Sequence, residues 1–166
     1  LNAEIGLARV ASGGSLKKKI RYTFGEEERN FSLIGKIRQT DGATAIDDKD
    51  YPPRSAMALE DGWLTRKTGD ARLDYLLVEA SDDSMSPTIL CGDDMLVDLS
   101  VSRVAGDGVY VLSAHGQLLV RRCRSCAGTD HIVVTADSVG PQDAERVGMD
   151  RLTVHGKVVW VGRSLG

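Results

Sequence analysis

The sequence that decides the fold begins as Asp82-Asp83-Ser84-Met85-Ser86-Pro87-Thr88-Ile89 and resumes two residues later as Gly92-Asp93-Asp94-Met95-Leu96-Val97-Asp98. Pro87 fixes its own φ and holds the residue before it extended, which makes the Ser-Met-x-Pro segment a tight bend. Gly92-Asp93 is a turn signal, and Met95-Leu96-Val97 is typical of a short buried strand. A serine on a rigid bend before a strand is a plausible nucleophile, and an ordinary loop that contains serine is the alternative.

Alternating and β-branched segments along the rest of the chain predict further strands, with little clear helix. His115-Gly116 is expected to form a two-residue hairpin loop in which the glycine takes a positive φ. Residues 137–150 are expected to be irregular. The strands are predicted at 75–80, 95–97, 108–113, 117–123, 131–136, 152–154 and 157–161. Together they place the chain in the mainly β class, as small twisted antiparallel sheets or a partly open barrel.

The chain before residue 59 has a different character from the rest. Its first residues are small and include a glycine pair, which indicates a pliable linker. Two alternating segments, 20–24 and 30–35, predict a hairpin, and residues 38–56, rich in Asp, Gly, Thr and Pro, predict a loop. We therefore expect an extended N-terminal arm ahead of the main domain. The expected divisions are a linker at 1–14, an insertion at 15–58 and a domain at 59–166.

The composition limits the classes of function. At 166 residues the chain can hold one good-sized domain with an arm, or two small domains. Aromatic residues make up only 5% of the sequence, so the core is expected to be aliphatic. A net charge of −3 gives no electrostatic footprint for nucleic acid, which places any DNA-reading part outside this chain. The start at Leu1 rather than Met predicts a fragment that lacks an N-terminal module.

The expected location is the cytoplasm, without membrane association. No apolar run approaches the roughly 18 residues that a membrane span needs, and no basic-then-apolar leader is present. The three cysteines are an odd number, which fits a reducing compartment better than a disulfide framework.

Several motifs, taken in chain order, resemble the LexA-like S24 peptidase domains, which form the C-terminal half of LexA, of many phage repressors and of UmuD. The segment from Val78 to Asp98 resembles the family's Gly-Asp-Ser-Met-x-Pro-Thr…Gly-Asp…Val-Asp signature. The resemblance covers roughly residues 60–166, and several ordered motifs are far more specific than any one of them. The further matches are Gly108 to Leu112, Leu118 to Arg122, Ala136-Asp137-Ser138 and Gly156-Lys157-Val158-Val159-Trp160.

The resemblance implies a serine that is activated by a neutral lysine. A serine hydroxyl is a poor nucleophile and needs a base within hydrogen-bond reach. The family's serine falls on Ser84, and its lysine falls on Arg121. An arginine guanidinium stays protonated in proteins, so it can donate a hydrogen bond to the serine but cannot accept the serine's proton.

Two more departures fall on parts that self-cleavage needs. The glycine that opens the family's serine box is Asp82 here, and the alanine before the scissile glycine is Ser12. Ser12-Gly13 is therefore the aligned cleavage site, with Gly13-Gly14 as the other choice and a plain flexible linker as the alternative. We expect from the three departures that the domain does not cleave itself efficiently.

No other base is expected to serve Ser84. Asp82 and Asp83 are too close to it in sequence to be aimed at it reliably. Nothing in the spacing places the remaining candidates beside it: Lys157, His115, His131 and His155.

Cys123-Arg124-Ser125-Cys126 is a C-x-x-C, a spacing that can bind zinc or act as a redox couple. A zinc site needs further ligands, and the two candidates, His131 and Cys91, are isolated in the sequence. The favoured interpretation is two reduced cysteines at a hairpin end. We therefore expect no metal and no cofactor.

The resemblance implies the regulatory and dimerisation domain of a LexA- or phage-repressor-like transcriptional regulator. Its expected partners are a second copy of the chain, operator DNA through the absent N-terminal module, and RecA or an antirepressor protein. In relatives the dimer forms through the C-terminal strands, which here predicts Val158 and Trp160 at the interface. The alternatives are an active serine autoprotease that cuts near Ser12-Gly13 in an SOS response, a UmuD-like protein, and a thiol or metal sensor that uses Cys123 and Cys126.

Overall fold

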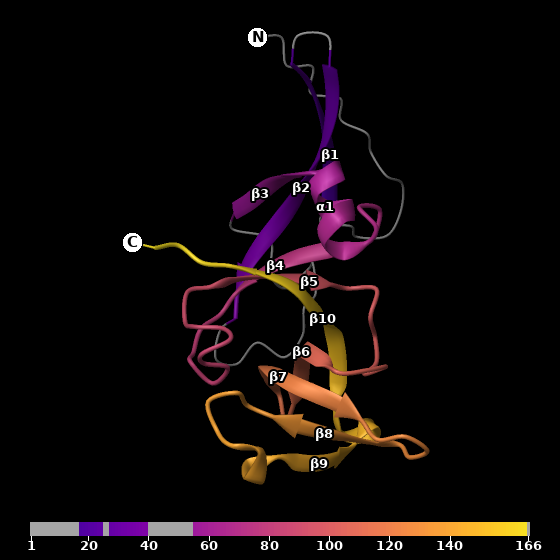
Figure 1. Cartoon of the computed structure of the whole chain (residues 1–166), viewed down its shortest axis with the longest axis vertical. Helices are drawn as coiled ribbons and strands as arrows, with labels where there is room; N and C mark the ends of the chain where they lie inside the picture. Colours follow the sequence, from indigo (N-terminus) through magenta and orange to yellow (C-terminus); the bar gives the residue numbers. More distant parts are fainter. Residues whose placement is uncertain (1–16, 25–26, 40–54, 166) are drawn as a thin grey trace.

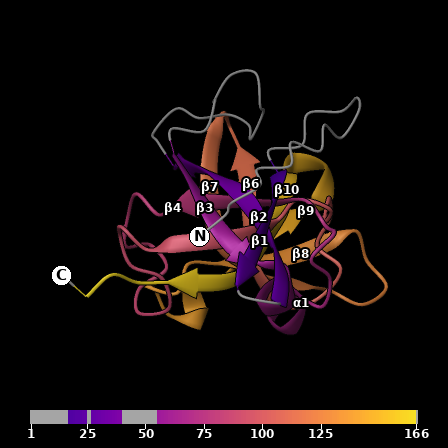
Figure 2. The same ribbon diagram turned by 90° about the horizontal axis from the view of Figure 1, so that it is seen from above.

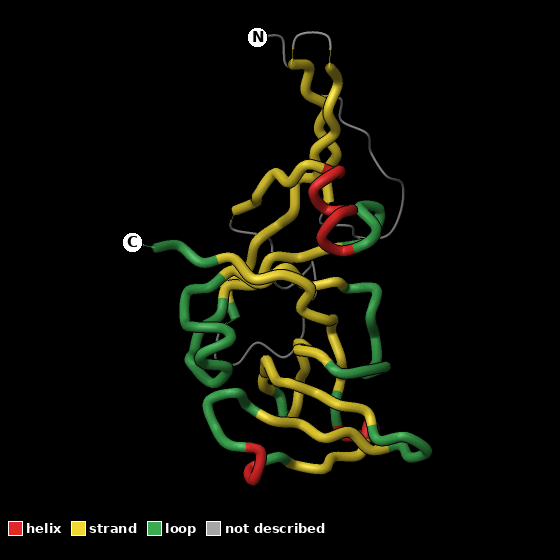
Figure 3. The backbone as a smooth tube through the Cα atoms, in the orientation of Figure 1, coloured by secondary structure: helices red, strands yellow, loops and turns green. Residues whose placement is uncertain are grey.

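The computed structural model describes residues 17–24, 27–39 and 55–165. Within these residues, ten strands join in one sheet whose ends do not close into a barrel, and one α-helix accompanies them (Figure 1). Strands make up most of the backbone in Figure 3, and helices are confined to short stretches. The prediction of a mainly β chain is confirmed.

The elements are mostly short strands separated by loops. The loop between β4 and β5 contains the serine bend. In chain order the elements are β1 (Lys17–Phe24), β2 (Glu27–Arg38), β3 (Ser55–Glu60), α1 (Asp61–Thr68), β4 (Tyr75–Glu79), β5 (Asp94–Asp98), β6 (Gly108–Ala114), β7 (Gln117–Ser125), β8 (His131–Thr135), β9 (Glu145–Gly148) and β10 (Thr153–Gly162), with 3-10 turns at Pro141–Asp143 and Met149–Arg151.

Strand β10 joins the two halves of the sheet. The strand order is β1-β2-β4-β5-β10-β6-β7-β8-β9, and β3 also pairs with β2. The pairings are antiparallel except that of β2 with β4, which is parallel. β10 pairs with β5 through its C-terminal part and with β6 through its N-terminal part. The halves β1 to β5 and β6 to β9 therefore meet on β10, as Figure 1 shows.

The core is aliphatic, as the composition predicts. Side chains of β4 and β5 alternate between two apolar clusters, so both strands are buried on both faces. Leu76 belongs to the cluster that includes β6 and β7 residues, whereas Leu77 belongs to the cluster that includes Leu64 of α1. A third cluster, around Tyr110 and Ile132, fills the half formed by β6 to β9. The serine bend thus lies between two strands that are fixed by packing on both sides.

The hairpin predicted near the N-terminus is present. Ile20 pairs with Phe31 in an antiparallel ladder between β1 and β2. Figure 1 shows this ladder projecting from one end of the molecule, and Figure 2 looks down on it. β2 then continues into the sheet, where Lys36 pairs with Leu77 and Ile34 is fully buried. Part of the 15–58 segment therefore contributes to the sheet and to the core.

Helix α1 differs from the sequence-based expectation of little helix. It is eight residues long and buries only Leu64, so it has almost no apolar periodicity that a sequence pattern could reveal. Gly69 ends the helix with a φ of 92°, a left-handed conformation that glycine adopts without strain. None of the described helices has the length and apolar character that a membrane span requires.

Three strands also depart from their expected boundaries. β9 crosses the 137–150 segment that is expected to be irregular, and its four residues are too few for a periodic signal. β3 begins inside the expected loop at 38–56. β10 is continuous where two segments are expected, with a register shift between Val154 and Gly156. The His115-Gly116 loop forms as predicted, with φ values of 49° and 77°.

Candidate functional site

Ser84 lies on the bend between β4 and β5, and apolar side chains anchor this bend in the core. Met85 and Ile89 are each 2% exposed and belong to the core cluster of β4 and β5. The amide of Ile89 donates to the carbonyl of Met85 at 2.9 Å, and the amide of Ser86 donates to the carbonyl of Asp83 at 3.0 Å. Ser84 itself is half-buried. Its buried neighbours therefore fix the position of a hydroxyl that stays partly accessible.

Two carboxylates stabilise this bend by accepting backbone hydrogen bonds. Asp82 Oδ1 accepts from the backbone N–H of Ser84 at 2.8 Å, and Asp83 Oδ1 accepts from that of Cys91 at 2.8 Å. Short-range bonds of this kind are the reason that Asp is common in turns. Where the family has a glycine, Asp82 therefore accepts a hydrogen bond from the backbone N–H of Ser84, and this donor is no longer available to other groups.

The bend is also tied to the turn after β8. The amide of Ser138 donates to the carbonyl of Ser84 at 3.0 Å. Thr88 Oγ1 donates to Asp137 Oδ2 at 2.6 Å, and the Arg122 guanidinium donates to both oxygens of that carboxylate. The Arg122 guanidinium lowers the pKa of the Asp137 carboxyl, burial partly opposes this, and the Thr88 hydroxyl adds to the lowering. The turn thus links the half of the sheet that bears Ser84 to the half that bears β7.

The structure brings Arg121 and Ser84 together. Arg121 lies on β7, opposite Tyr110 of β6. Its Nη1 donates to Ser84 Oγ at 2.9 Å and to the carbonyl of Val120 at 2.7 Å. Within the described residues, Arg121 is the hydrogen-bond partner of the Ser84 side chain. Because the guanidinium keeps its protons, it offers a donor to the hydroxyl and no base.

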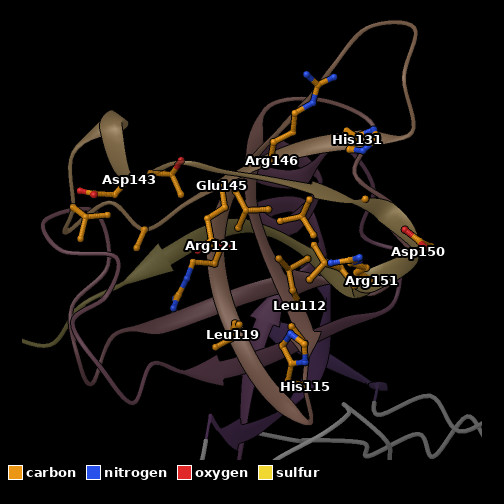
Figure 4. Close-up of a pocket in the computed structure, with 18 residues that line it drawn as sticks. Leu112, His115, Leu119, Arg121, His131, Asp143, Glu145, Arg146, Asp150 and Arg151 are labelled. Atoms are coloured by element: carbon orange, nitrogen blue, oxygen red, sulfur yellow. The ribbon is translucent and has the colours of Figure 1, made fainter.

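A cleft of about 850 Å³ adjoins Arg121 (Figure 4). Residues of β6, β7, β8 and β9 line it, and its apolar lining includes Leu112, Leu119 and Val134. The charged residues of its rim are exposed, whereas Arg121 is half-buried. Arg121 thus contacts the serine bend and also lines an open cleft of mixed apolar and charged residues. The charged rim residues are Asp143, Glu145, Arg146, Asp150 and Arg151.

The other titratable side chains considered as bases have different surroundings. His155 Nε2 lies 2.9 Å from Ser113 Oγ, and burial lowers its pKa. Lys157 Nζ lies over the ring of Tyr110, 5.7 Å from its centroid. The two remaining histidines, at 115 and 131, line the cleft. In the described part of the chain none of these four residues hydrogen-bonds to the serine at position 84.

The two C-x-x-C cysteines are free thiols in different surroundings. Cys123 is fully buried, and burial raises its pKa to about 12, although the nearby Arg121 opposes the increase. Cys126 is partly buried, and Cys91 is exposed on the serine bend. A buried protonated thiol is a poor nucleophile and a poor metal ligand. No group of three or more His, Cys, Asp or Glu that could hold a metal ion occurs among the described residues.

The remaining predicted site residues are the cleavage-site pair and the two interface residues of β10. Ser12 and Gly13 fall outside the described residues. Val158 packs partly buried against the core cluster of β4 and β5, and Trp160 packs edge-to-face against Trp63 with 5.4 Å between ring centroids. Both lie on β10, whose edges are paired with β5 and β6. A contact with a second copy would therefore use the part of these side chains that remains exposed.

Asp93 contributes to the site in a way that sequence reasoning does not identify. Its side chain is 2% exposed and accepts from Arg163 Nε at 2.8 Å, from Arg163 Nη2 at 2.6 Å and from the backbone N–H of Leu90 at 2.8 Å. The Arg163 guanidinium lowers the pKa of this carboxyl, burial opposes the change, and the Leu90 amide adds to it. Gly92-Asp93 signals a turn, but nothing in the pattern points to a partner 70 residues away.

Fold and site together define a β-rich domain of the serine-peptidase type, in which the serine lies on a bend between strands and contacts a cationic side chain. The sequence profile of the family described as Peptidase S24-like matches residues 32–159, and the chain belongs to this family. Membership confirms the resemblance and supports a LexA- or UmuD-like regulator or protease as the general class. A comparison with curated proteins gives no match.

Proposed function

We propose that this chain is the regulatory and self-associating domain of a LexA- or phage-repressor-like transcriptional regulator, and that its self-cleavage is impaired. The observation that supports impaired cleavage is the 2.9 Å hydrogen bond from the Arg121 guanidinium to Ser84 Oγ. In the family a lysine amine takes the hydroxyl proton from this position once burial has lowered its pKa. The guanidinium donates instead, so Ser84 keeps its proton and remains a weak nucleophile.

The backbone around Ser84 is also poorly suited to acyl transfer. Serine peptidases stabilise the developing oxyanion with backbone N–H groups, and the N–H of the serine itself serves this purpose in enzymes of the trypsin type. Here that N–H donates to Asp82 Oδ1 at 2.8 Å. A carboxylate in this place occupies the donor and repels a developing negative charge. Arg121 and Asp82 are thus two separate features that oppose efficient cleavage.

We expect the wild-type chain to remain intact during prolonged incubation at about pH 10, where a lysine base would be partly neutral. The physical reason is the missing base, whose usual contribution is roughly 10²- to 10⁴-fold in rate. Intact mass spectrometry over several days measures the outcome. Two fragments whose masses correspond to a cut near Ser12-Gly13, and that are absent in Ser84→Ala, would overturn the role given to Arg121.

An active autoprotease is the second candidate, and one observation favours it. The serine bend is fully formed, with Met85 and Ile89 buried beneath it, and Ser84 stays partly accessible. On this reading RecA filaments stimulate a cut near Ser12-Gly13. The incubation at high pH separates the two candidates. A UmuD-like protein belongs to the same class, and it differs from a repressor in lacking a DNA-binding module.

The proposed role of the domain is to present two DNA-binding modules to a two-fold operator. Linking two weak DNA contacts raises the overall affinity through effective concentration. We propose that Val158 and Trp160 contribute to the contact between copies, and that operator DNA is bound through an N-terminal module outside this chain. Induction, in the cytoplasm, would then use RecA or an antirepressor protein.

We expect the chain to form a homodimer at micromolar concentration. Size-exclusion chromatography with light scattering should give twice the monomer mass of 17.9 kDa, with a shift toward the monomer on dilution. Reversible dissociation is expected because the residues proposed at the contact are already half-buried within one copy. A strict monomer at the highest attainable concentration would contradict the proposal of self-association.

A further inference from the structure

Strand β3 has one edge without a partner strand. Its antiparallel ladder with β2 runs from Ser55, opposite Lys36, to Glu60, opposite Phe31, and no other strand of the described chain joins it. Every second residue of an antiparallel strand turns its N–H and C=O away from the partner. Within the described residues, positions 55–58 make no backbone hydrogen bond outside this ladder. The outer edge of β3 therefore presents free donors and acceptors at a margin of the sheet (Figure 1).

The two ends of the sheet are protected against pairing with a further strand, whereas β3 is not. The sheet ends at β1, which contains Lys17-Lys18-Lys19 and Arg21, and at β9, which has only four residues. Charged residues and short length both discourage pairing at an edge. β3 has six residues, Ser-Ala-Met-Ala-Leu-Glu, without lysine, arginine or proline. Its free edge is therefore suited to accept another strand.

The two faces of β3 differ, which limits the register in which a strand can pair with it. Ala56 and Ala58 are exposed, whereas Met57 and Leu59 are half-buried against the apolar cluster that includes Leu64 of α1. A partner strand continues this pattern only if it brings apolar residues to the face of Met57 and Leu59. A second β3 does so when a two-fold axis passes through Met57 or Ala58, because residues of the same face then lie opposite each other.

The charges of β3 also permit this pairing. Glu60 is the only charged residue of the strand, and its Oε1 lies 3.6 Å from Arg29 Nη1 of the same copy. With the axis at Ala58, Glu60 lies opposite Ala56 of the other copy. With the axis at Met57, it lies beyond the paired residues of the other β3. Like charges directly opposite each other would destabilise the pair, and neither register produces them.

We infer that the free edge of β3 pairs with β3 of a second copy, so that the sheets of two copies join across a two-fold axis. The inference rests on the proposed function and assigns a particular strand to self-association. Met57 and Leu59 belong to the same apolar cluster as Trp160, the residue that the proposed function already places at the contact between copies. Pairing at β3 extends that contact, and main-chain hydrogen bonds add affinity to the apolar burial.

Charged substitutions of Ala58 test the pairing in the full chain. In both registers the two copies of residue 58 lie on one face, either directly opposite or diagonal, within reach of long side chains. Ala58→Lys and Ala58→Glu should each weaken the dimer about 10-fold, because like charges meet across the axis. An equimolar mixture of the two variants should restore association, because Lys then faces Glu. Sedimentation equilibrium measures the dissociation constants.

Ala127→Lys is the matched control for these variants. Ala127 is an exposed alanine in the loop between β7 and β8, so the same change there should leave the dissociation constant unchanged.

Amide hydrogen exchange of the wild type tests the same edge without any substitution. In the dimer, the outward amides of β3 gain hydrogen-bond partners, so amides within residues 55–59 should exchange more slowly than after dilution to the monomer. The amides of β9, at the protected end of the sheet, should exchange at the same rate in both states.

The outcomes separate this inference from the proposed function. The inference would be overturned by a wild-type dimer whose Ala58 variants associate as strongly as it does, or whose β3 amides exchange at the monomer rate. Self-association would then stand, but through another surface. A mixture that associates no better than the separate variants would also contradict a two-fold contact at Ala58. If the variants do not fold, amide exchange decides. A wild type that stays monomeric would instead remove the self-association itself.

Discussion

Replacement of Arg121 by lysine is expected to make the chain cleave itself near Ser12-Gly13 at alkaline pH. A lysine at this position of β7 presents an amine toward Ser84 Oγ, to which Arg121 Nη1 donates at 2.9 Å. An amine with the ordinary lysine pKa near 10.4 is partly neutral at about pH 10 and can take the serine's proton, which a guanidinium cannot. The expected gain in rate is roughly 10²- to 10⁴-fold, the usual contribution of a general base.

Asp82 is expected to set a second limit on the rate. Asp82→Gly releases the backbone N–H of Ser84, which donates to Asp82 Oδ1 at 2.8 Å. One oxyanion donor typically contributes roughly 10²- to 10³-fold, so the double variant with Arg121→Lys should cleave faster than the single variant. Asp82→Gly alone should leave the chain intact, because the guanidinium remains in contact with the hydroxyl.

Intact mass spectrometry across a pH series measures these rates. Ser84→Ala in the double variant must abolish the fragments, since it removes the nucleophile. Arg124→Lys makes the same chemical change on the opposite face of β7 and should not cleave. Folded Arg121→Lys and double variants that stay intact at every pH would mean that position 121 does not limit the reaction.

The contact between Ser84 and Arg121 can be predicted because the resemblance to the S24 family aligns these residues with the family's serine and lysine. The hydrogen bond from Ser84 N–H to Asp82 cannot, because it depends on the torsions of one short polar side chain, which no periodicity encodes. The same holds for Asp93 and Arg163, which are 70 residues apart and meet through a tail that follows the last strand. The family resemblance thus identifies two residues that face each other, but not which hydrogen bonds the surrounding polar atoms make.

The N-terminal part of the sheet shows a second limit on what the sequence pattern can predict. The alternation at 30–35 predicts a strand, and the hairpin with 20–24 forms. Alternation shows that one face of a strand is buried, but it does not name the strand that pairs with it. The parallel pairing of β2 with β4 follows from the burial of Ile34 and Ile37 against the rest of the core, which is a tertiary effect. Helix α1 and strand β9 are too short to give a pattern at all.

Ser84 and Arg121 belong to different halves of the sheet, so their contact depends on the strand that joins the halves. β10 pairs with β5 on one edge and with β6 on the other, and its pairing with β6 shifts register between Val154 and Gly156. A Cβ at Gly156 would lie 2.6 Å from the backbone oxygen of Asp98 and 2.5 Å from Val97 Cγ1. The glycine of the Gly-x-Val-Val-Trp motif is therefore required by the close approach of β5 and β10.

Gly156→Ala is expected to lower the free energy of unfolding by about 3 kcal/mol, the upper end of the usual cost of overpacking. The nearest atoms include backbone of β5, which cannot rotate away as a flexible side chain can, so β5 and β10 must separate. Gly106→Ala is the matched control, because a Cβ there meets no atom within 4 Å. Its effect should be neutral or stabilising by less than about 1 kcal/mol. Chemical denaturation of both variants measures the difference.

The effect of Gly156→Ala should also reach the site, because β5 holds one end of the serine bend. When β5 moves relative to β10, Ser84 moves relative to residue 121 on β7, and a misplacement of about 1 Å can cost roughly 10²-fold in rate. In the Arg121→Lys background, Gly156→Ala is therefore expected to slow cleavage at temperatures where the protein remains folded, whereas Gly106→Ala leaves the rate unchanged. A Gly156→Ala protein as stable as the wild type would show that β5 and β10 accommodate the added methyl group. The packing between these strands would then be less tight than the 2.6 Å from this Cβ to the Asp98 oxygen implies.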